Sequence, residues 1–393
     1  MCIRDRRNII TAVEEALRKE NIPFASYAIT DKNETILYEH FGTQDLTKEL
    51  PPTNDTRYRI ASMSKAVTTL AALKLLDDGK LQLNTNAKEY FPELGEIKVA
   101  KLHENNITYD EIESDITIHQ LLSHTSGFGY DFHDPTLSHL VVNQELAPLT
   151  SKDGSQLKAP LAYQPGTRWE YGISLGWIGK IIEKISGNNL NDFITEKVFL
   201  PLGMKDSTFD ASTFDKKNIA VLHAMEAENF INVDDFVDDS TDGFYYGGGG
   251  IYSTPDDYCK FMRLFLNEGK INGNPFISAN TLDLMMKNQI GDLNYLHQPT
   301  FNPSLIHPHE WYPEIKKKFT YGFLTNLEDM PGRRKSGSLA WSGICNTYFW
   351  IDPASGLGGT LMMQLSPHYD KKCINVLEAL EKAAYSELEV LNN

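Results

Sequence analysis

Apolar side chains recur with helical spacing in several segments of the chain and alternate with polar side chains in others. The helical pattern is clearest in residues 8–20, 63–78, 116–123, 175–186, 190–198, 255–267 and 370–388. Strand-like segments are residues 26–41, with a turn-type cluster at 31–33, and residues 347–351 and 359–364, which flank a second turn at 352–356. Strands therefore stand near both ends of the chain, with helices and loops between them.

This arrangement predicts an α+β fold in which the terminal segments meet in one antiparallel sheet flanked by helices. We expect residues 8–82 and 243–393 to form one discontinuous α/β lobe and residues 83–242 to form an all-helical lobe. Residues 1–6 fit poorly with the segment that follows, and we expect them to be a non-native leader.

The composition provides enough apolar material for a large core and argues against two kinds of partner. The chain has 393 residues, of which 41% are hydrophobic, and a formal net charge of −16. A protein that binds nucleic acid by neutralising phosphates is expected to be basic. Acidity gives no attraction to anionic lipid either, so we expect neither partner.

No apolar stretch approaches the roughly 18 residues that a membrane-spanning helix needs, so we expect no membrane span. The N-terminus is charged but has no apolar segment behind it, unlike a secretory signal. We therefore expect a cytoplasmic protein, and the alternative is a periplasmic or secreted one whose signal peptide has been lost. The four cysteines lie far apart and are expected to be free thiols. The sequence does not fix an oligomeric state.

The first candidate for chemistry is Ser62-Met63-Ser64-Lys65, at the start of a predicted helix. Residues i and i+3 share a helix face, so the Lys65 amine can reach the Ser62 hydroxyl. Apolar neighbours favour a lowered pKa for Lys65, which a base for serine requires. As a bare pattern, S-x-x-K also fits an ordinary helix start with a surface lysine, so its context has to decide.

That context is a set of further motifs in a fixed order. The segments are 59–65 (RIASMSK), 121–130 (LLSHTSGFGY), 164–172 (QPGTRWEYG), 247–255 (GGGGIYSTP) and 347–353 (TYFWIDP). Together they resemble the serine β-lactamase and D-alanyl-D-alanine carboxypeptidase superfamily, in particular its branch of class C β-lactamase-like carboxylesterases, known as family VIII esterases. The resemblance covers most of the chain and implies a β-lactamase/transpeptidase-like fold with an acyl-enzyme mechanism.

The resemblance also implies roles for individual residues. Ser62 is then the nucleophile and Lys65 its general base, with no metal and no other cofactor. Tyr171 stands at the family's second-motif tyrosine, which relays protons to the leaving group and helps to activate water. A phenol with a pKa of about 10 is a poor base, so we expect a neighbouring cation such as Lys65 to lower the pKa of Tyr171.

Two tripeptides compete for the third motif. Lactamases and peptidases of the family carry Lys-Thr-Gly, which holds the substrate carboxylate, whereas the esterase branch resembles Trp-Gly-Gly. Trp341-Ser342-Gly343 matches the latter except at Ser342, and it leads into the predicted strand 347–351. Lys335-Ser336-Gly337 satisfies the lactamase pattern, but its basic surroundings favour a solvated loop. We therefore expect Trp341, Ser342 and Gly343 to contact the substrate.

With Trp341 in this place, the pocket lacks a cation for a substrate carboxylate. The oxyanion hole then consists of the backbone N–H groups of Ser62 and Ile344. The second motif departs from the lactamase Tyr-x-Asn as well, because Ile173 follows Tyr171-Gly172. Loss of the asparagine, which would bind a substrate amide, favours an ester with an apolar acyl group over a β-lactam or a peptide.

Several other residues admit a structural as well as a functional interpretation. Tyr130 matches an aromatic that lines the family's active-site cleft, and both a pocket wall and plain packing remain open. Residues 172–176 satisfy G-x-S-x-G, but no buried strand precedes them, as a nucleophile elbow would require. Residues 307–310 (HPHE) lie in a Pro-rich segment without a second ligand cluster, so we expect a loop there and no metal.

The sequence thus predicts a serine hydrolase that cleaves a small-molecule carboxylic ester through an acyl-enzyme on Ser62. Within the same chemistry, the alternatives are an acyltransferase that passes the acyl group to an alcohol, and a β-lactamase or D-amino-acid peptidase. From a different class, the alternative is a non-catalytic binding or scaffold protein of the same fold. Intact Ser62, Lys65 and Tyr171 argue against that last interpretation.

Overall fold

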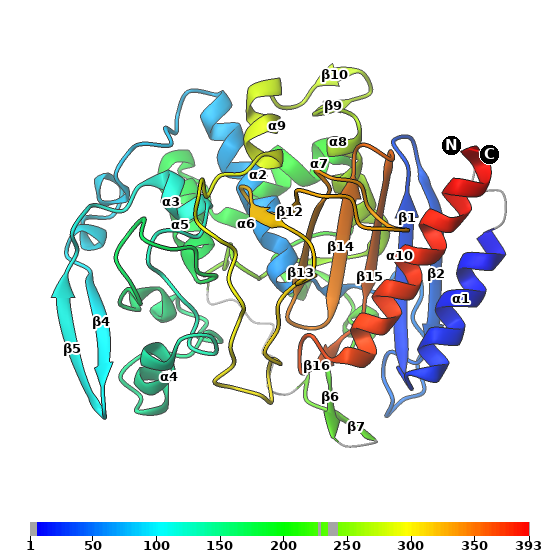
Figure 1. Ribbon diagram of the computed structural model, residues 1–393, viewed down its shortest axis with the longest axis horizontal. Coiled ribbons are helices and arrows are strands. Elements are labelled where there is room, and N and C mark those ends of the chain that lie inside the picture. The colour runs from blue at the N-terminus through cyan, green and yellow to red at the C-terminus, as the bar shows by residue number, and fades with distance from the viewer. Residues whose placement is uncertain (1–5, 227–228, 235–242, 393) are drawn as a thin grey trace.

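Seven strands form the central sheet in the order β11-β12-β13-β14-β15-β1-β2, and each neighbouring pair is antiparallel (Figure 1). The computed structural model describes residues 6–226, 229–234 and 243–392. The strands are β1 (Phe24–Thr30), β2 (Thr35–Gly42), β11 (Lys317–Phe319), β12 (Leu324–Asn326), β13 (Leu339–Gly343), β14 (Thr347–Asp352) and β15 (Leu357–Met362). Because β1 pairs with β15, Ser26 lies opposite Met362. The predicted α+β fold, with terminal segments joined in one antiparallel sheet, is therefore confirmed.

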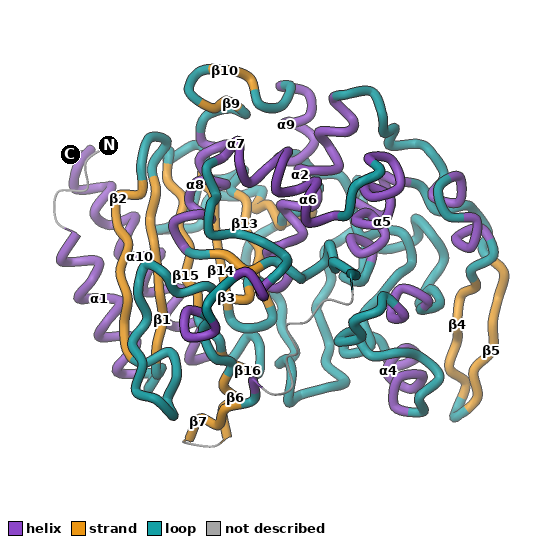
Figure 2. The backbone as a smooth tube through the Cα atoms, turned by 180° about the vertical axis from the view of Figure 1, so that it is seen from behind, coloured by secondary structure: helices purple, strands orange, loops and turns teal. Residues whose placement is uncertain are grey.

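Helices cover both faces of this sheet, and β1, β14 and β15 consequently bury all of their residues. The terminal helices α1 (Arg6–Lys19) and α10 (Lys371–Asn392) lie side by side on one face, and α8 (Pro255–Leu266) packs on the other (Figures 1 and 2). In α1 the buried residues Ile9, Val13 and Leu17 repeat every four positions, which gives the helix one apolar side for the sheet.

Helix α2 (Ser64–Asp77) connects the sheet to a region built mainly of helices, and it is buried along most of its length. It contacts α5 and α6. The helices of this region are α3 (Ile118–Leu122), α4 (Pro135–Val142), α5 (Ser174–Ser186), α6 (Leu190–Ile194) and α7 (Leu200–Leu202).

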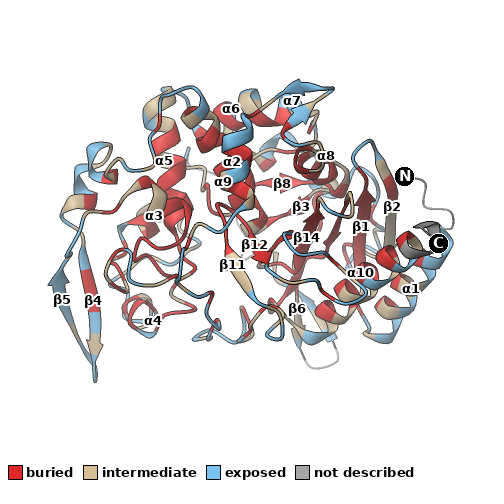
Figure 3. Cartoon of the chain, turned by 45° about the horizontal axis from the view of Figure 1, so that its top comes forward, coloured by how far each residue is buried: buried red, intermediate tan, exposed pale blue. Residues whose placement is uncertain are grey.

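Residues 83–242 were expected to form an all-helical lobe, but this region also contains a β hairpin. Its strands are β4 (Lys98–His103) and β5 (Asn106–Glu111), and β5 is exposed along most of its length (Figure 3). An exposed strand has little need of apolar side chains on either face, so β5 lacks the alternation by which strands are predicted.

Several short pairings complete the described fold. Strand β3 (Tyr58–Arg59) pairs with β8 (Tyr252–Ser253), and β9 (Lys270–Ile271) pairs with β10 (Asn274–Pro275). Strand β6 (His223–Glu226) lies between β7 (Asn229–Asn232) and β16 (Leu365–Ser366). The helix α9 (Ala279–Met286) follows β10. The β3–β8 pair matters most for function, because it brings the segment before Ser62 beside the glycine run at 247–250.

Two expectations about the chain as a whole bear on this description. Residues 1–5 of the expected leader lie outside the described residues, and Arg6 begins α1. Within the described ranges, no helix combines the length and the apolar composition needed to cross a membrane.

Candidate active site

Ser62 lies where the chain turns sharply from a strand into a helix. After β3 ends at Arg59, a single 3-10 turn (Ala61–Met63) leads directly into α2. Ala61 has a φ of +45°, a left-handed conformation that alanine rarely adopts. Backbone strain of this kind is concentrated at functional sites, where the surrounding structure enforces it. Here it sets the direction of the residue that follows, Ser62.

Lys65 points its amine at Ser62 from the first turn of α2. Its Nζ lies 3.1 Å from Ser62 Oγ and donates to the Gly248 carbonyl oxygen at 2.5 Å. The side chain is fully buried, and burial lowers the pKa of Lys65 well below its usual value. A neutral amine that donates one hydrogen to Gly248 keeps its lone pair free for the Ser62 proton.

The glycine run holds the far side of Lys65 by close approach of backbones. A Cβ on Gly247 would lie 2.7 Å from the carbonyl oxygen of Leu175 in α5. Thr68 of α2 donates to the Gly247 carbonyl at 2.8 Å. A larger residue at 247 would therefore push this segment away from both helices and displace the Gly248 carbonyl.

Tyr171 completes a hydrogen-bonded cluster with Ser62. Its phenol oxygen accepts the indole N–H of Trp341 at 3.1 Å, and Lys65 Nζ lies 4.7 Å from the centre of its ring. Burial raises the pKa of Tyr171, and the hydrogen bonds with Ser62 and Trp341 only partly oppose this effect. The expected lowering of the pKa by Lys65 is thus wrong. Tyr171 rests as a protonated phenol, because its buried neighbour is itself inclined to lose its charge.

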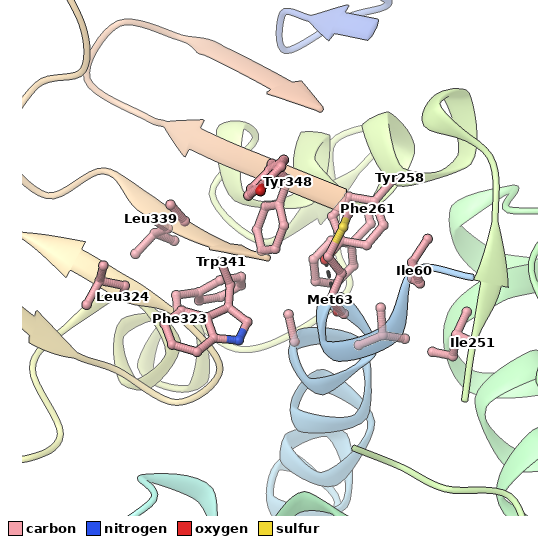
Figure 4. Packing of buried hydrophobic residues seen from close by; sticks show 14 of the residues in the cluster. Ile60, Met63, Ile251, Tyr258, Phe261, Phe323, Leu324, Leu339, Trp341 and Tyr348 are labelled. Atoms are coloured by element: carbon pink, nitrogen blue, oxygen red, sulfur yellow. Dashed lines mark hydrogen bonds between the residues drawn. The ribbon is translucent and has the colours of Figure 1, made fainter. Parts of the chain in front are cut away.

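Trp341 reaches Tyr171 from the central strand β13. Figure 4 shows its indole next to Phe323, facing the first turn of α2. Two residues on, Gly343 packs against the turn that carries Ser62, and a Cβ there would lie 2.2 Å from the Ile60 carbonyl oxygen. Position 343 requires a glycine because the two backbone segments lie so close together. This close packing brings Ile344 to the wall of the same pocket as Ser62.

The rival tripeptide lies elsewhere. Lys335 is 56% exposed and pairs with Asp329 at 3.2 Å, in a turn before β13. Its backbone N–H donates to Asp352 at 2.9 Å, which ties the turn to the end of β14. Neither Lys335 nor Ser336 lines the pocket beside Ser62.

Tyr130 supports the site from behind Tyr171. Its ring meets that of Tyr171 edge to face, with centres 5.2 Å apart, and stacks on Phe132 at 4.7 Å. Its hydroxyl bonds with that of Tyr246 at 3.0 Å. Phe132, which the sequence did not single out, lines the pocket.

The G-x-S-x-G motif at residues 172–176 and the HPHE segment at residues 307–310 both have structural roles. Ser174 of G-x-S-x-G is buried at the start of α5, where its hydroxyl bonds with that of Ser126 at 2.8 Å. Residues 307–310 form part of the long loop between α9 and β11. Across the described part of the chain, no group of three His, Cys, Asp or Glu residues is arranged to hold a metal ion.

A narrow pocket with a cavity volume of about 30 Å³ opens beside Ser62. It is lined by Ser62, Phe132, His133, Tyr171, Gln298, Ile306, His309, Trp311, Trp341, Ser342, Ile344 and His368. Of these, Ser62, Tyr171, Trp341, Ser342 and Ile344 were expected from the sequence. Tyr130 and Gly343, which were also expected to contact the substrate, are not among the lining residues, because Tyr130 lies behind Tyr171 and Gly343 packs against the Ile60 carbonyl. The other lining residues come from loops, in which apolar side chains have no regular spacing. In the sequence, only the two histidines in residues 307–310 had drawn attention to this part of the pocket.

Comparison with known proteins agrees with this geometry. The family model described as beta-lactamase matches residues 9–381. The monacolin J acid methylbutanoyltransferase of Aspergillus terreus is 29% identical, over 96% of this chain and 95% of that protein. The lovastatin esterase of Penicillium rubens is 28% identical, over 78% of each chain. The unliganded structure of simvastatin synthase from Aspergillus terreus superposes with a TM-score of 0.81 and 26% identity, and covers 96% of this chain and 97% of its own.

Proposed function

The chain belongs to the beta-lactamase family of serine hydrolases, and we propose that Ser62 is the nucleophile with which it cleaves a carboxylic ester. The observation that carries this proposal is the position of Lys65, a buried amine 3.1 Å from the Ser62 hydroxyl. Neutral Lys65 accepts the Ser62 proton while Oγ attacks the ester carbonyl carbon. The oxygen of the tetrahedral intermediate accepts hydrogen bonds from the backbone N–H groups of Ser62 and Ile344.

Tyr171 acts in the second half of acylation. Its protonated phenol donates a proton to the departing alkoxide, and the Trp341 indole N–H stabilises the phenolate that is left. The proton held by Lys65 then returns to Tyr171, which restores both groups. In deacylation water attacks the acyl-enzyme, gives its proton to the same pair, and releases the acid and free Ser62.

The substrate class follows from the charge of the pocket. None of its described lining residues is Lys or Arg, so a substrate carboxylate would be buried without a countercharge. Ile173, in place of the lactamase asparagine, is buried and offers no amide. Both features support a neutral ester over a β-lactam or a peptide with a free carboxylate.

Transfer to an alcohol is the second candidate function. The methylbutanoyltransferase relative is similar over 96% of this chain, so the fold around the acyl-enzyme is shared with a protein named for acyl transfer. In that reaction an alcohol takes the place of water in deacylation, with the same proton acceptor.

The proposal also treats the site as one unit built from two lobes. Ser62 and Trp341 belong to residues 8–82 and 243–393, and Tyr171 belongs to residues 83–242. Neither lobe alone would then hold the complete catalytic cluster.

The test compares p-nitrophenyl butyrate with a chromogenic cephalosporin, using the wild type and Ser62→Ala. We expect ester hydrolysis that depends on Ser62 and little turnover of the cephalosporin. Addition of a primary alcohol, with chromatography of the products, measures how the acyl group divides between water and alcohol. Ser62-dependent turnover of the cephalosporin alone would contradict the proposed substrate class, and no Ser62-dependent turnover of either would favour a non-catalytic binding protein.

A further inference from the structure

A wall of hydrogen-bond acceptors borders the pocket beside Ser62 and takes no part in the mechanism above. We propose that this acceptor wall, formed by His133, Gln298 and His309, binds a hydroxyl group of the ester, so that the enzyme prefers hydroxylated esters to their apolar analogues. The inference rests on the proposed function and adds the substrate class to it.

His133 presents an acceptor because its other nitrogen is committed as a donor. Nδ1 lies 2.6 Å from the Pro299 carbonyl oxygen, which can only accept, so Nδ1 carries the hydrogen. Burial lowers the pKa of His133 to about 4, and the ring is therefore neutral near neutral pH. Its Nε2 then carries a lone pair, and no residue that the structure describes donates to it.

His309 repeats this arrangement. Its Nδ1 lies 3.0 Å from the His307 carbonyl oxygen, and burial lowers its pKa to about 3. The ring stacks on Tyr369 at 4.3 Å, which fixes its plane, and its centre lies 6.0 Å from that of His133. Two imidazole lone pairs are thus held close together, and no donor from the described ranges of the chain reaches their Nε2 atoms.

Gln298 adds a third acceptor. Its Nε2 donates to the Leu296 carbonyl at 2.9 Å, and this bond fixes which end of the amide is oxygen. The Oε1 atom is buried and has no hydrogen-bond partner among the described residues. A buried acceptor without a partner is unfavourable, so a donor from a ligand would relieve it.

The loop that carries two of these residues is fixed at several points. Gln298 and His309 exchange backbone hydrogen bonds at 2.8 and 2.9 Å. The Phe301 N–H donates to the Phe132 carbonyl, and the His307 N–H donates to the His368 carbonyl, both at 2.9 Å. The acceptors are therefore held in place before a substrate arrives, which favours selective binding.

The lining favours a hydroxyl over other donors. No Asp or Glu is among the described lining residues, so an ammonium group would be buried without a countercharge. A hydroxyl also needs a donor for its own oxygen. Ser342 can supply one, since it lines the pocket and its Oγ pairs with His368 Nε2 at 3.2 Å, in either direction of donation.

The experiment compares two pairs of esters that differ by a hydroxyl in place of a methyl group. On the acyl side the pair is p-nitrophenyl β-hydroxybutyrate and p-nitrophenyl isovalerate, and on the alcohol side it is hydroxyethyl butyrate and propyl butyrate. We expect kcat/KM for the hydroxylated ester to be higher by at least about tenfold in one pair, because an apolar group would leave the acceptors unpaired. The pair that responds shows which side of the ester meets the wall.

Substitutions then tie this preference to the acceptors. In His133→Asn and His309→Asn the amide N–H can replace Nδ1–H towards its carbonyl, but the Nε2 acceptor is lost. We expect the preference to fall at least about fivefold in each, and to be largely retained in His309→Gln, which keeps an acceptor at the outer position. The control is His103→Asn, an exposed histidine of β4, which should keep both the activity and the preference.

The two proposals fail in different ways. Ser62-dependent turnover with equal kcat/KM within both pairs would overturn the acceptor wall and leave the proposed function standing. A preference that survives in both Asn variants, with unfolding midpoints like that of the wild type, would also overturn it. No Ser62-dependent turnover of any of the four esters would overturn the proposed function, and this inference with it.

Discussion

The two walls of the pocket differ in their hydrogen-bonding chemistry: one can transfer protons, and the other only accepts hydrogen bonds from a ligand. On one side Ser62 interacts with both Lys65 and Tyr171, so a proton that leaves one side chain has another to receive it. On the acceptor wall, His133 and His309 each donate to a backbone carbonyl, which cannot give a proton back. Burial favours the neutral form of the bases on both walls, and it prepares the first wall for proton transfer and the second for fixed hydrogen bonding.

This difference predicts how each wall responds to substitution. Removing a member of the proton-transfer cluster should affect every substrate, because each turnover passes through it. Removing a member of the acceptor wall should instead change the ratio between substrates.

Lys65 gives the largest expected effect. Lys65→Met removes the base but keeps the length of the side chain, and we expect kcat/KM to fall on the order of 10³-fold for hydroxylated and apolar esters alike. Lys65→Arg should lose as much, since a guanidinium stays protonated and cannot accept the Ser62 proton. The kcat/KM of each ester pair is to be measured beside the unfolding midpoint. High activity in a folded Lys65→Arg protein would mean that positive charge, and not basicity, is what Ser62 needs.

The acceptor wall gives the next effect, on stability rather than on rate. The folded pKa of His133 is lowered to about 4, below the usual 6.5, so between these values the unfolded chain binds more protons than the folded one. Stability is therefore complete above pH 6.5 and falls with pH, by roughly 3 kcal/mol for this one group at pH 4. Urea unfolding across this range should show the loss, and His133→Asn should reduce its slope.

Other groups titrate near His133, so the variant needs its own controls. Burial also lowers the pKa values of His309 and His368, so protonation of these rings would add to the same acid sensitivity. His103→Asn should leave the slope of the wild type unchanged, because that side chain is exposed. An equal slope in His133→Asn and the wild type would mean that His133 is not held neutral by burial.

The two walls also differ in how far the sequence could predict them. Lys65 follows Ser62 by one helical turn, so their contact is local, and a family motif indicated Tyr171 and Trp341. Gln298 and His309 lie in a segment with Pro299, Pro303, Pro308 and Pro313, without any periodicity. Their positions depend on backbone bonds to Phe132 and His368, which are distant in sequence, and no local pattern reports such contacts.

The same reasoning explains which elements of the fold were predicted and one that was missed. β14 and β15 combine apolar runs with a strong turn at 352–356, so local pattern and tertiary burial agree there. The β4–β5 hairpin is mostly polar, and it was missed because backbone pairing alone defines it.

Trp341 gives the smallest effect and separates the two candidates for the third motif. Trp341→Phe removes the indole N–H that lies 3.1 Å from the Tyr171 hydroxyl but keeps an aromatic ring beside it. One hydrogen bond to a group that becomes charged is worth about tenfold, so we expect kcat/KM to fall by that factor for both members of an ester pair. Lys335→Ala removes an exposed ion pair with Asp329 and should leave kcat/KM within about twofold, as surface pairs contribute little. The reverse order of these effects would place the third motif at Lys335 and return a carboxylate-binding cation to the site. A fall confined to the hydroxylated ester in Trp341→Phe would assign Trp341 to substrate recognition, and the division between the two walls would then have to be drawn elsewhere.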